Sequence, residues 1–309
     1  MADVDVRSGE WLDDNRANWD ERVPVHVGSE FYDRSTLRAG GSQLDPIAAA
    51  GVARLFPEGL DAVRVLHLQC HFGSDTLSLA NLGAEVIGLD FSVPAIEEAR
   101  RMADELGLSR RARFIEGNVY DARRLLPEPE SFDLVFVTWG TITWLPDVAE
   151  WAKIVAWFLK PGGRLYFADA HPTAWMFDYA DEPDSEAGAP ASDVPADEPA
   201  ASLPVVKYPY GEIGADILED PADYADPDAV LQHARTWEWA HPLSQTMGAL
   251  RDAGLVIEEF EEHYRLPWRI FPQTVPLGEG MFGWPDRRWI PLAAEIVAVH
   301  RPETARRDA

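Results

Sequence analysis

The sequence predicts an α/β protein with a doubly wound, Rossmann-like sheet of seven strands, mostly parallel and with an antiparallel C-terminal edge strand. Three observations support this class. Residues from about 44 to 169 alternate short β-branched runs with amphipathic helical patterns, as repeated β-α units do. The 309 residues are 46% hydrophobic, which is enough to bury a full core. Two late strands are joined by a loop with no helix, which predicts an antiparallel hairpin at a sheet edge.

The expected elements follow one another with clear boundaries. Each strand is a short apolar run, and the helices between them carry start and stop residues. One helix has Pro94 in its first turn and Gly107 at its end, and a late helix begins near Pro242 and ends at Gly254. In order, we expect strands at 63–68, 84–90, 112–117, 132–138 and 163–169, helices at 74–82, 93–107 and 146–163, then the late helix, a strand after it and a last strand at 293–301.

Two segments fall outside this repeat and are expected to cover the main domain. Residues 1–43 form an amphipathic, helical N-terminal cover, and the main domain spans 44–309 with an acidic, Pro-rich insertion at about 172–232. Between 181 and 230 there are 14 Asp or Glu, one Lys and eight Pro. This composition is typical of a disordered solvent loop, but its middle, LPVVKYPYGEI, has enough β-branched and aromatic residues for a short hairpin or lid. Both interpretations stay open.

The formal charge of −26, from 53 acidic and 27 basic residues, makes nucleic acids and anionic membranes poor partners. A single cysteine, Cys70, excludes an internal disulfide framework and a multi-cysteine metal site. The N-terminus has no apolar core of signal-peptide length, and no apolar run reaches about 18 residues, which predicts a cytoplasmic protein. No metal cluster stands out in the sequence, so we expect metal-independent chemistry. A homo-oligomer is compatible with these features.

The turn after the first strand, in VRVLHLQCHFGSDTLSLANL, predicts a ligand site. A strand followed by a tight turn and a helix presents backbone N–H groups to a polar ligand. A dinucleotide needs the G-x-G-x-x-G pattern for close approach of its pyrophosphate, but Gln69, His71 and a non-glycine at position 74 stand at those places. This argues against NAD or FAD. Gly73 leaves room for a smaller adenosine-type group, whose polar tail Gln69 and His71 could bind.

Asp90 is the most specific single position. It ends the second strand, 17 residues after Gly73, where a carboxylate can accept hydrogen bonds from both ribose hydroxyls. The alternative is that it caps the next helix, and Ser92 is the better candidate for that cap.

Five motifs in order resemble the class I S-adenosylmethionine-dependent methyltransferases: VLHLQCHFG, VIGLDFS, FIEGNVYD, FDLVFVTWGTITWLPD and FLKPGGRLYFAD. The resemblance is close over about residues 60 to 170. The first motif departs from the family, which has an acidic residue at the place of His67 and glycines at 69 and 71. A related branch of small-molecule methyltransferases carries a similar HLQCHFG, so we interpret the change as a variant.

The resemblance implies S-adenosylmethionine as cofactor, S-adenosylhomocysteine as product and a small-molecule methyl acceptor. Asp90 would bind the ribose, Phe91 would pack on the adenine, and the strand ends would line the crevice. Asn118 stands where many relatives have Asp. The cofactor-binding residues implied in this way are Gln69, His71, Phe72, Gly73, Asp90, Phe91, Ser92, Asn118, Val119, Tyr120, Thr138, Trp139 and Gly140, with Trp19 and Tyr32 as cover residues.

Methyl transfer from a sulfonium needs alignment of the acceptor more than a reactive side chain, but an O or N acceptor gains from a nearby base, and carbon is a further acceptor. His171, directly after the fifth strand, is the first candidate, and His241, at the start of the late helix, is the second. Asp169 could orient one of them or bind substrate. Two alternatives remain at this stage: an NAD(P)-type oxidoreductase, and an S-adenosyl ligand-binding protein without turnover.

Overall fold

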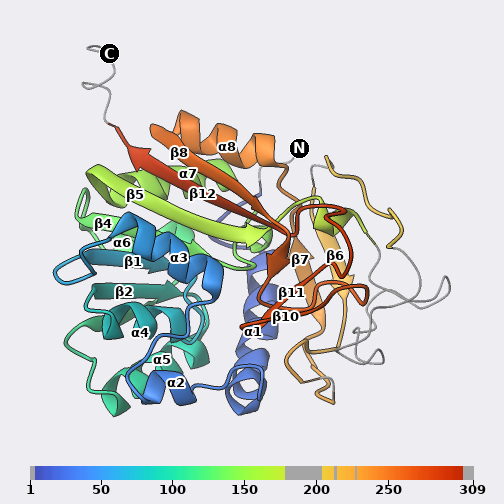
Figure 1. The fold of residues 1–309 in the computed structure, drawn as a ribbon, viewed down its shortest axis with the longest axis horizontal. Coiled ribbons are helices and arrows are strands. Elements are labelled where there is room, and N and C mark those ends of the chain that lie inside the picture. Colours follow the sequence, from blue (N-terminus) through green and yellow to red (C-terminus); the bar gives the residue numbers. More distant parts are fainter. Residues whose placement is uncertain (1–3, 178–203, 212–213, 227, 302–309) are drawn as a thin grey trace.

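The computed structural model describes residues 4–177, 204–211, 214–226 and 228–301. Its centre is a seven-stranded sheet with the order β3-β2-β1-β4-β5-β12-β8 (Figure 1). Strands β1 to β5 pair in parallel, which confirms the predicted doubly wound class. The strands of this sheet are β1 (Arg64–Leu68), β2 (Glu85–Asp90), β3 (Ala112–Glu116), β4 (Phe132–Thr138), β5 (Leu159–Ala170), β8 (Leu255–His263) and β12 (Ala293–His300).

The C-terminal strand β12 is antiparallel, as expected, and it forms a hairpin-like pair with β8 at the edge of the sheet. Its place differs from the prediction by one position, because β8 occupies the edge and β12 lies between β5 and β8. The two sequences explain the order. AAEIVAVH is buried along almost its whole length, whereas the charged side chains of LVIEEFEEH are largely exposed, as an edge strand requires.

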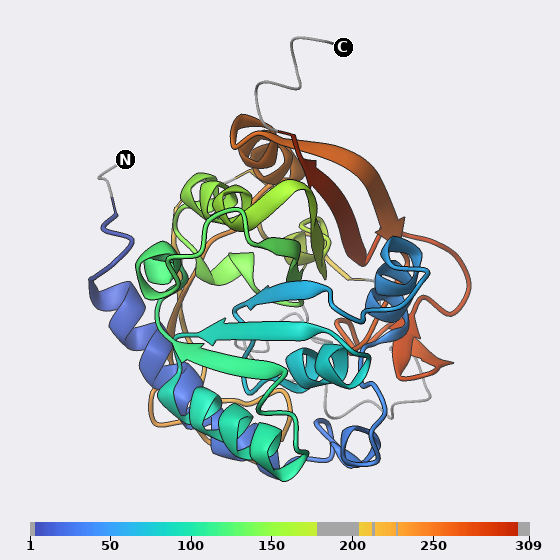
Figure 2. The same cartoon turned by 90° about the vertical axis from the view of Figure 1, so that its left-hand side faces the viewer.

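Helices cover both faces of the sheet (Figures 1 and 2). One face packs against α3 (Pro46–Leu55), α4 (Ser74–Asn81) and α5 (Val93–Glu105) through a continuous apolar cluster. The other face packs against α6 (Ala122–Leu125), α7 (Val148–Phe158) and α8 (Leu243–Asp252). The core therefore has two apolar layers, and the carboxyl ends of the strands are left to the loops.

Local chemistry sets the starts of these helices. Asp45 accepts hydrogen bonds from the first N–H groups of α3, and the Ser92 hydroxyl caps α5 by accepting from Ala95 N. Helix α4 begins at Gly73, whose φ of +79° is left-handed. A Cβ at Gly73 would lie 2.6 Å from the Phe114 ring, so packing inside the fold requires this glycine. This differs from the expectation that Gly73 is kept open for a ligand.

The N-terminal segment contains α1 (Glu10–Gly28) and α2 (Ser35–Arg38). Helix α1 lies across the end of the main sheet, between it and the two-stranded pair of β6 (Asp216–Glu219) and β7 (Arg235–Glu238) (Figure 1). Residues 178–203, which hold much of the predicted insertion and the first residue of the expected hairpin LPVVKYPYGEI, lie outside the described residues, as do Glu212 and Ile213 of that hairpin. Within the described part of that hairpin, Val206 forms a bridge with Phe177.

The remaining elements are short. A three-stranded sheet of β9 (Arg265–Leu266), β10 (Val275–Gly278) and β11 (Met281–Gly283) fills the loop between β8 and β12. The 3-10 turns are η1 (Val119–Asp121), η2 (Ile142–Trp144) and η3 (Ala174–Met176). None of the helices in the described ranges has the length and apolar character needed to cross a membrane.

Candidate active site

The turn between β1 and α4 contains residues in the left-handed backbone conformation that glycine usually adopts. Gln69 has a φ of +57°, His71 of +51° and Gly73 of +79°. Left-handed conformations of non-glycine residues cost on the order of 1–3 kcal/mol and cluster at functional sites. Gln69 is held by its side chain, whose Nε2 donates to Thr141 O at 2.7 Å and so bridges the crevice between β1 and β4. The turn has the shape of a nucleotide-binding turn but carries large side chains.

Three buried polar atoms of this turn have no hydrogen-bond partner among the described residues. They are Gln69 Oε1, His71 Nε2 and Ser74 Oγ. Buried polar atoms are almost always satisfied, so a group of three in one turn points to a polar ligand. Burial lowers the pKa of His71 well below its usual range, so its ring is neutral. The turn thus offers an acceptor in Gln69 and groups that can donate in His71 and Ser74.

Asp90, at the end of β2, joins the turn to the start of α5. Its carboxylate accepts hydrogen bonds from His71 N at 2.8 Å and from Ser92 N at 3.0 Å. Burial raises the pKa of Asp90 to about 6, against the effect of these backbone donors. The Ser92 hydroxyl caps α5 and donates to Asp20 at 2.6 Å, so Asp90 is not needed as the helix cap. The Asp90 oxygens therefore keep lone pairs for a ligand.

The residues expected around an adenine divide into two groups. Phe91 is partly buried, with the Arg16 guanidinium 6.0 Å from its ring centroid, and Asn118 donates to Val6 O at 3.0 Å. Val119 and Tyr120 are buried in the core instead, and the Tyr120 hydroxyl donates to Asp147 O at 3.0 Å. Phe91 and Asn118 thus contact the N-terminal segment, while the Tyr120 ring points into the core.

The end of β4 supplies the opposite wall. Thr138 Oγ1 donates to Asp75, and Trp139 Nε1 donates to Asp45 at 2.7 Å. Trp139 and Gly140 are both left-handed, with φ of +54° and +66°. No described atom lies within 4 Å of the position that a Cβ on Gly140 would take, so this residue faces open space. Gly140 therefore offers a ligand close approach to its backbone.

The buried Asp169 holds this wall in place. Its carboxylate accepts from Gly140 N at 2.6 Å, from Thr141 N at 3.1 Å and from Ala170 N at 2.8 Å. Burial raises the pKa of Asp169, while the three backbone donors act in the opposite direction. We therefore correct the expectation that Asp169 orients a histidine, because its hydrogen bonds in the structure go to the loop after β4 and to Ala170.

His171 and His241, the histidines expected to act as a base, are both tied to nearby groups. His171 Nδ1 lies 2.7 Å from Thr173 Oγ1, and its Nε2 is 3.3 Å from Glu262. His241 Nε2 donates to Leu145 O at 2.8 Å. Burial lowers the pKa of both rings. A small pocket of about 30 Å³ lies beside the end of β5, lined in part by Asp169, Trp175, Trp239 and His241.

Residues 65–163 match the family model of a methyltransferase domain. The chain carries a class I methyltransferase domain. Curated relatives agree: it is 31% identical over 136 residues to a demethylmenaquinone methyltransferase of Beutenbergia cavernae, covering 42% of this chain and 52% of the relative. It is also 31% identical over 127 residues to a ubiquinone biosynthesis O-methyltransferase of Methylocella silvestris, covering 41% and 47%. The chain thus spans about half the length of these relatives.

Solved structures share the fold of the methyltransferase domain. A SAM-dependent methyltransferase from Methanosarcina mazei is 20% identical, with a TM-score of 0.54, over 84% of this chain and 99% of the other. The geranyl diphosphate C-methyltransferase of Streptomyces coelicolor A3(2) is 13% identical, with a TM-score of 0.52, over 96% of this chain and 100% of the other. At these identities the likeness establishes the architecture alone.

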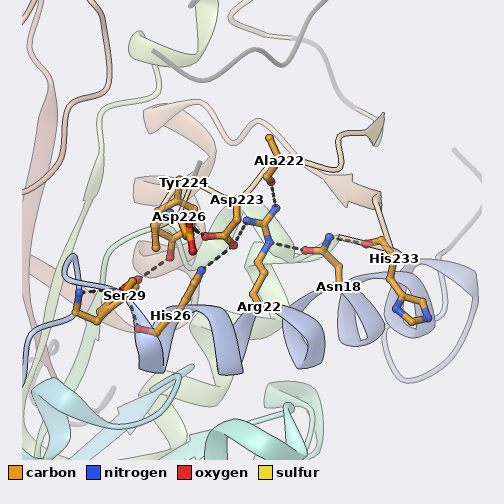
Figure 3. A network of polar contacts seen from close by, with 11 residues as sticks. Asn18, Arg22, His26, Ser29, Ala222, Asp223, Tyr224, Asp226 and His233 are labelled. Atoms are coloured by element: carbon orange, nitrogen blue, oxygen red, sulfur yellow. Dashed lines mark hydrogen bonds and ion pairs between the residues drawn. The ribbon is translucent and has the colours of Figure 1, made fainter. Parts of the chain in front are cut away.

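Helix α1 is docked on the segment around β7 by a stripe of buried polar residues (Figure 3). Asn15 bonds both the N–H and the C=O of Trp237 at 2.8 Å, so it pairs with β7 as a strand would. Further along, Asn18 donates to His233 O, and Arg22 and His26 both contact Asp223. The positions 15, 18, 22 and 26 share one helical face, which accounts for the contact of the whole face with residues 222–238.

An aromatic cage lies between α1 and the first turn, and we define it as Trp19, His26, Tyr32, His71, Trp144 and Tyr224. The ring of Trp19 is 5.4 Å from that of His71 and 5.3 Å from that of Trp144. Tyr32 stacks on His26 with a centroid distance of 5.0 Å. Trp19 and Tyr32, expected as cover residues, thus border the first turn of the methyltransferase domain. The sequence pattern did not single out His26, although NWDERVPVH shows its helical spacing from Trp19 and Arg22.

One group of side chains in the described ranges has spacing suited to a metal ion, formed by Glu261, His263 and Glu295. It lies on the β8–β12 pair, where Glu295 is in register with Ala168 near the end of β5. Glu295 already contacts His263 at 2.8 Å and Arg54 at 2.5 Å. These contacts use both oxygens of the buried carboxylate in protein ion pairs.

Proposed function

We propose that the protein transfers a methyl group from S-adenosylmethionine to a small acceptor that carries a hydroxyl on an aromatic ring. The observation that carries the proposal is the first turn, where three unpartnered polar atoms surround a glycine-like path next to the buried carboxylate of Asp90. A methyltransferase domain over residues 65–163 supports the same reaction class.

The residues present fit the cofactor group by group. Asp90 has lone pairs for two ribose hydroxyls, and Phe91 offers a ring face for the adenine. Gln69 Oε1 suits the ammonium of the amino-acid tail, while His71 and Ser74 can donate to its carboxylate. When bound, S-adenosylmethionine supplies a methyl group activated by a positive sulfur. The chain's own task is to align the acceptor with that methyl group and to exclude water.

Two features support a hydroxylated aromatic acceptor. The curated relatives are named for methylation in menaquinone and ubiquinone biosynthesis. The aromatic cage borders the first turn with several ring faces, which suits a flat ring. The N-terminal cover and the mid-chain segment 216–238 would then enclose the acceptor from the side opposite the sheet. The experiments below test methyl transfer to an oxygen atom.

The alternatives predict different ligands. An NAD(P)-type oxidoreductase needs close approach of a pyrophosphate, which the side chains of Gln69 and His71 obstruct. A binding protein without turnover would bind the adenosyl ligands and yield no methylated product.

Calorimetric titration with S-adenosylmethionine, S-adenosylhomocysteine and NADH tests the proposal. We expect the two adenosyl ligands to bind with a Kd of about micromolar order, −8 kcal/mol, and NADH not to bind. Binding of NADH alone, or of no ligand, would overturn it. A second assay follows transfer of a labelled methyl group to catechol, and binding without transfer to any phenolic acceptor would leave only the ligand-binding alternative.

A further inference from the structure

Helix α1 places a histidine–aspartate pair over the first turn, and the cofactor contacts described above do not use it. The side chain of His26 is fully buried, and its Nε2 lies 3.0 Å from Asp223 Oδ2 (Figure 3). Arg22 lies 2.9 Å from the same oxygen. Burial opposes ionisation of Asp223, but its contacts with His26 and Arg22 hold the pKa of this carboxyl below its usual range. An ionised Asp223 can only accept a hydrogen bond, so it favours the tautomer in which Nε2 carries the hydrogen and Nδ1 carries the lone pair.

That lone pair has no partner in the described part of the chain. His26 Nδ1 is buried and unpaired, and so is Nε2 of His71, whose ring centroid lies 5.2 Å away. The unpartnered Nδ1 of His26 calls for a hydrogen-bonding group of a ligand beside the first turn. An Nδ1 that only accepts calls for a donor, such as a hydroxyl.

The aromatic cage extends from this position to exposed rings. Phe31 and Tyr224 stand at its outer end with 48% and 51% of their surface exposed, and their rings are 5.7 Å apart. Tyr32 and His26 follow inward, and Trp19 beside Trp144 forms the inner end next to the β4 loop. A cluster of ring faces favours a flat aromatic molecule as the ligand.

We propose that His26, oriented by Asp223, is the general base that takes the proton from a phenolic hydroxyl of the acceptor. The O–H bond breaks, the proton moves to His26 Nδ1 and the electron pair stays on the oxygen. That oxygen forms the bond to the methyl carbon, and the sulfur keeps the electrons of the broken carbon–sulfur bond. This inference rests on the proposed function and prefers His26 to the histidines favoured by the sequence. His171 Nε2 lies 3.3 Å from Glu262 at the edge of the sheet, and His241 Nε2 donates to Leu145 O, whereas His26 lies beside the first turn.

The test uses 4-nitrocatechol, whose ionised form absorbs visible light. The absorbance of the bound probe is titrated against pH on the full chain, with and without S-adenosylhomocysteine. We expect the probe to ionise about one pH unit or more below its value in water on the wild type, and to lose this shift on His26→Gln. The charged and titratable groups that face His26, and that the pH curves must account for, are Arg22, Tyr32, His71, Asp223 and Tyr224.

Two further variants make the result specific. Asp223→Asn should lose most of the shift because Nε2 is no longer anchored as a donor. His233→Gln is the matched control, since this exposed histidine lies at the same contact but pairs with Glu21. It should behave as the wild type. With catechol and S-adenosylmethionine, His26→Gln should lower kcat by roughly 100-fold or more while the affinity for S-adenosylhomocysteine stays unchanged.

The outcomes separate this inference from the proposed function. If the wild type does not bind S-adenosylhomocysteine, the proposed function fails. If it binds that ligand, but the probe either does not bind or ionises equally on His26→Gln, the role of His26 is wrong. If His26→Gln weakens binding of S-adenosylmethionine but not of S-adenosylhomocysteine, the role of His26 as a base is also wrong. The cage would then hold the positive sulfur and not the acceptor.

Discussion

Asp90→Asn tests the cofactor site most directly, because it changes one oxygen of a carboxylate without changing its size. In the wild type that carboxylate accepts two backbone N–H groups, from His71 and Ser92, and still has lone pairs for two ribose hydroxyls. Asparagine keeps one acceptor oxygen. Hydrogen bonds to a charged group are worth about 1.5–3 kcal/mol, so loss of one and weakening of the other should cost about 3 kcal/mol. That equals roughly a 100-fold rise in the Kd for S-adenosylhomocysteine.

In the unliganded protein, Asp90→Asn should raise the free energy of unfolding at pH 7. Burial raises the folded pKa of Asp90 from 3.8 to about 6, so ionisation at pH 7 costs on the order of 3 kcal/mol. The folded pKa exceeds the unfolded one, so this group's stabilisation is complete below pH 3.8 and is lost as the pH rises through 6. Acidification from pH 7 to 5 should therefore stabilise the wild type relative to Asp90→Asn in urea unfolding. Over the same range, protonation of Asp90 should weaken ligand binding in the wild type alone.

The control is Asp133→Asn. Asp133 accepts from Arg64 N at 2.9 Å and from Lys160 at 2.7 Å, so it is similarly engaged, but it lies at the start of β4, at the opposite end of the sheet. Its substitution should lower stability and leave the Kd unchanged. An Asp90→Asn protein that is folded and binds S-adenosylhomocysteine as tightly as the wild type would refute the assignment of Asp90 to the ribose.

Three other expectations follow from the structure. Asn15→Ala removes two 2.8 Å bonds to the β7 backbone and should cost about 2–4 kcal/mol of unfolding free energy, whereas Asp13→Ala on the exposed side of α1 should cost little. Gly73→Ala combines a left-handed φ with a 2.6 Å approach to Phe114 and should cost about 2–4 kcal/mol in thermal unfolding, against about 1 for Gly162→Ala, which has a left-handed φ but open space. Dialysis against a chelator should leave binding of S-adenosylmethionine and transfer to catechol unchanged, and activity restored only by added metal would contradict this.

The sheet could be predicted from the sequence because each of its signals is local. Short apolar runs such as FDLVFVT became strands, and the Ser92–Pro94 start of α5 appeared as expected. The hairpin signal alone could not predict that β12 lies next to β5 and that β8 forms the edge of the sheet. It depended on comparing how the two strands bury their side chains, and the charged alternation of LVIEEFEEH was the available clue.

The candidate site was predicted in part. The places of Asp90 and of the first turn follow from strand ends, but distance from a strand end does not lead to the base that we propose. His171 and His241 stand next to the crevice in sequence and are held by local partners, whereas His26 reaches the first turn only through the docking of α1. Its partner Asp223 lies 197 residues away, in a segment with no regular pattern. Contacts of that separation leave no periodic signal in a single sequence.

The left-handed residues at the crevice have a wider consequence for how such proteins are found and altered. A sequence search for the glycine pattern does not detect this turn. Gln69, His71 and Trp139 nevertheless have the left-handed backbone conformation that glycine usually adopts. At each of these places a side chain stands where glycine would offer only a hydrogen atom. The side chains at these three positions can therefore be exchanged to vary the chemistry of the crevice wall. The surrounding residues already fix the backbone conformation there.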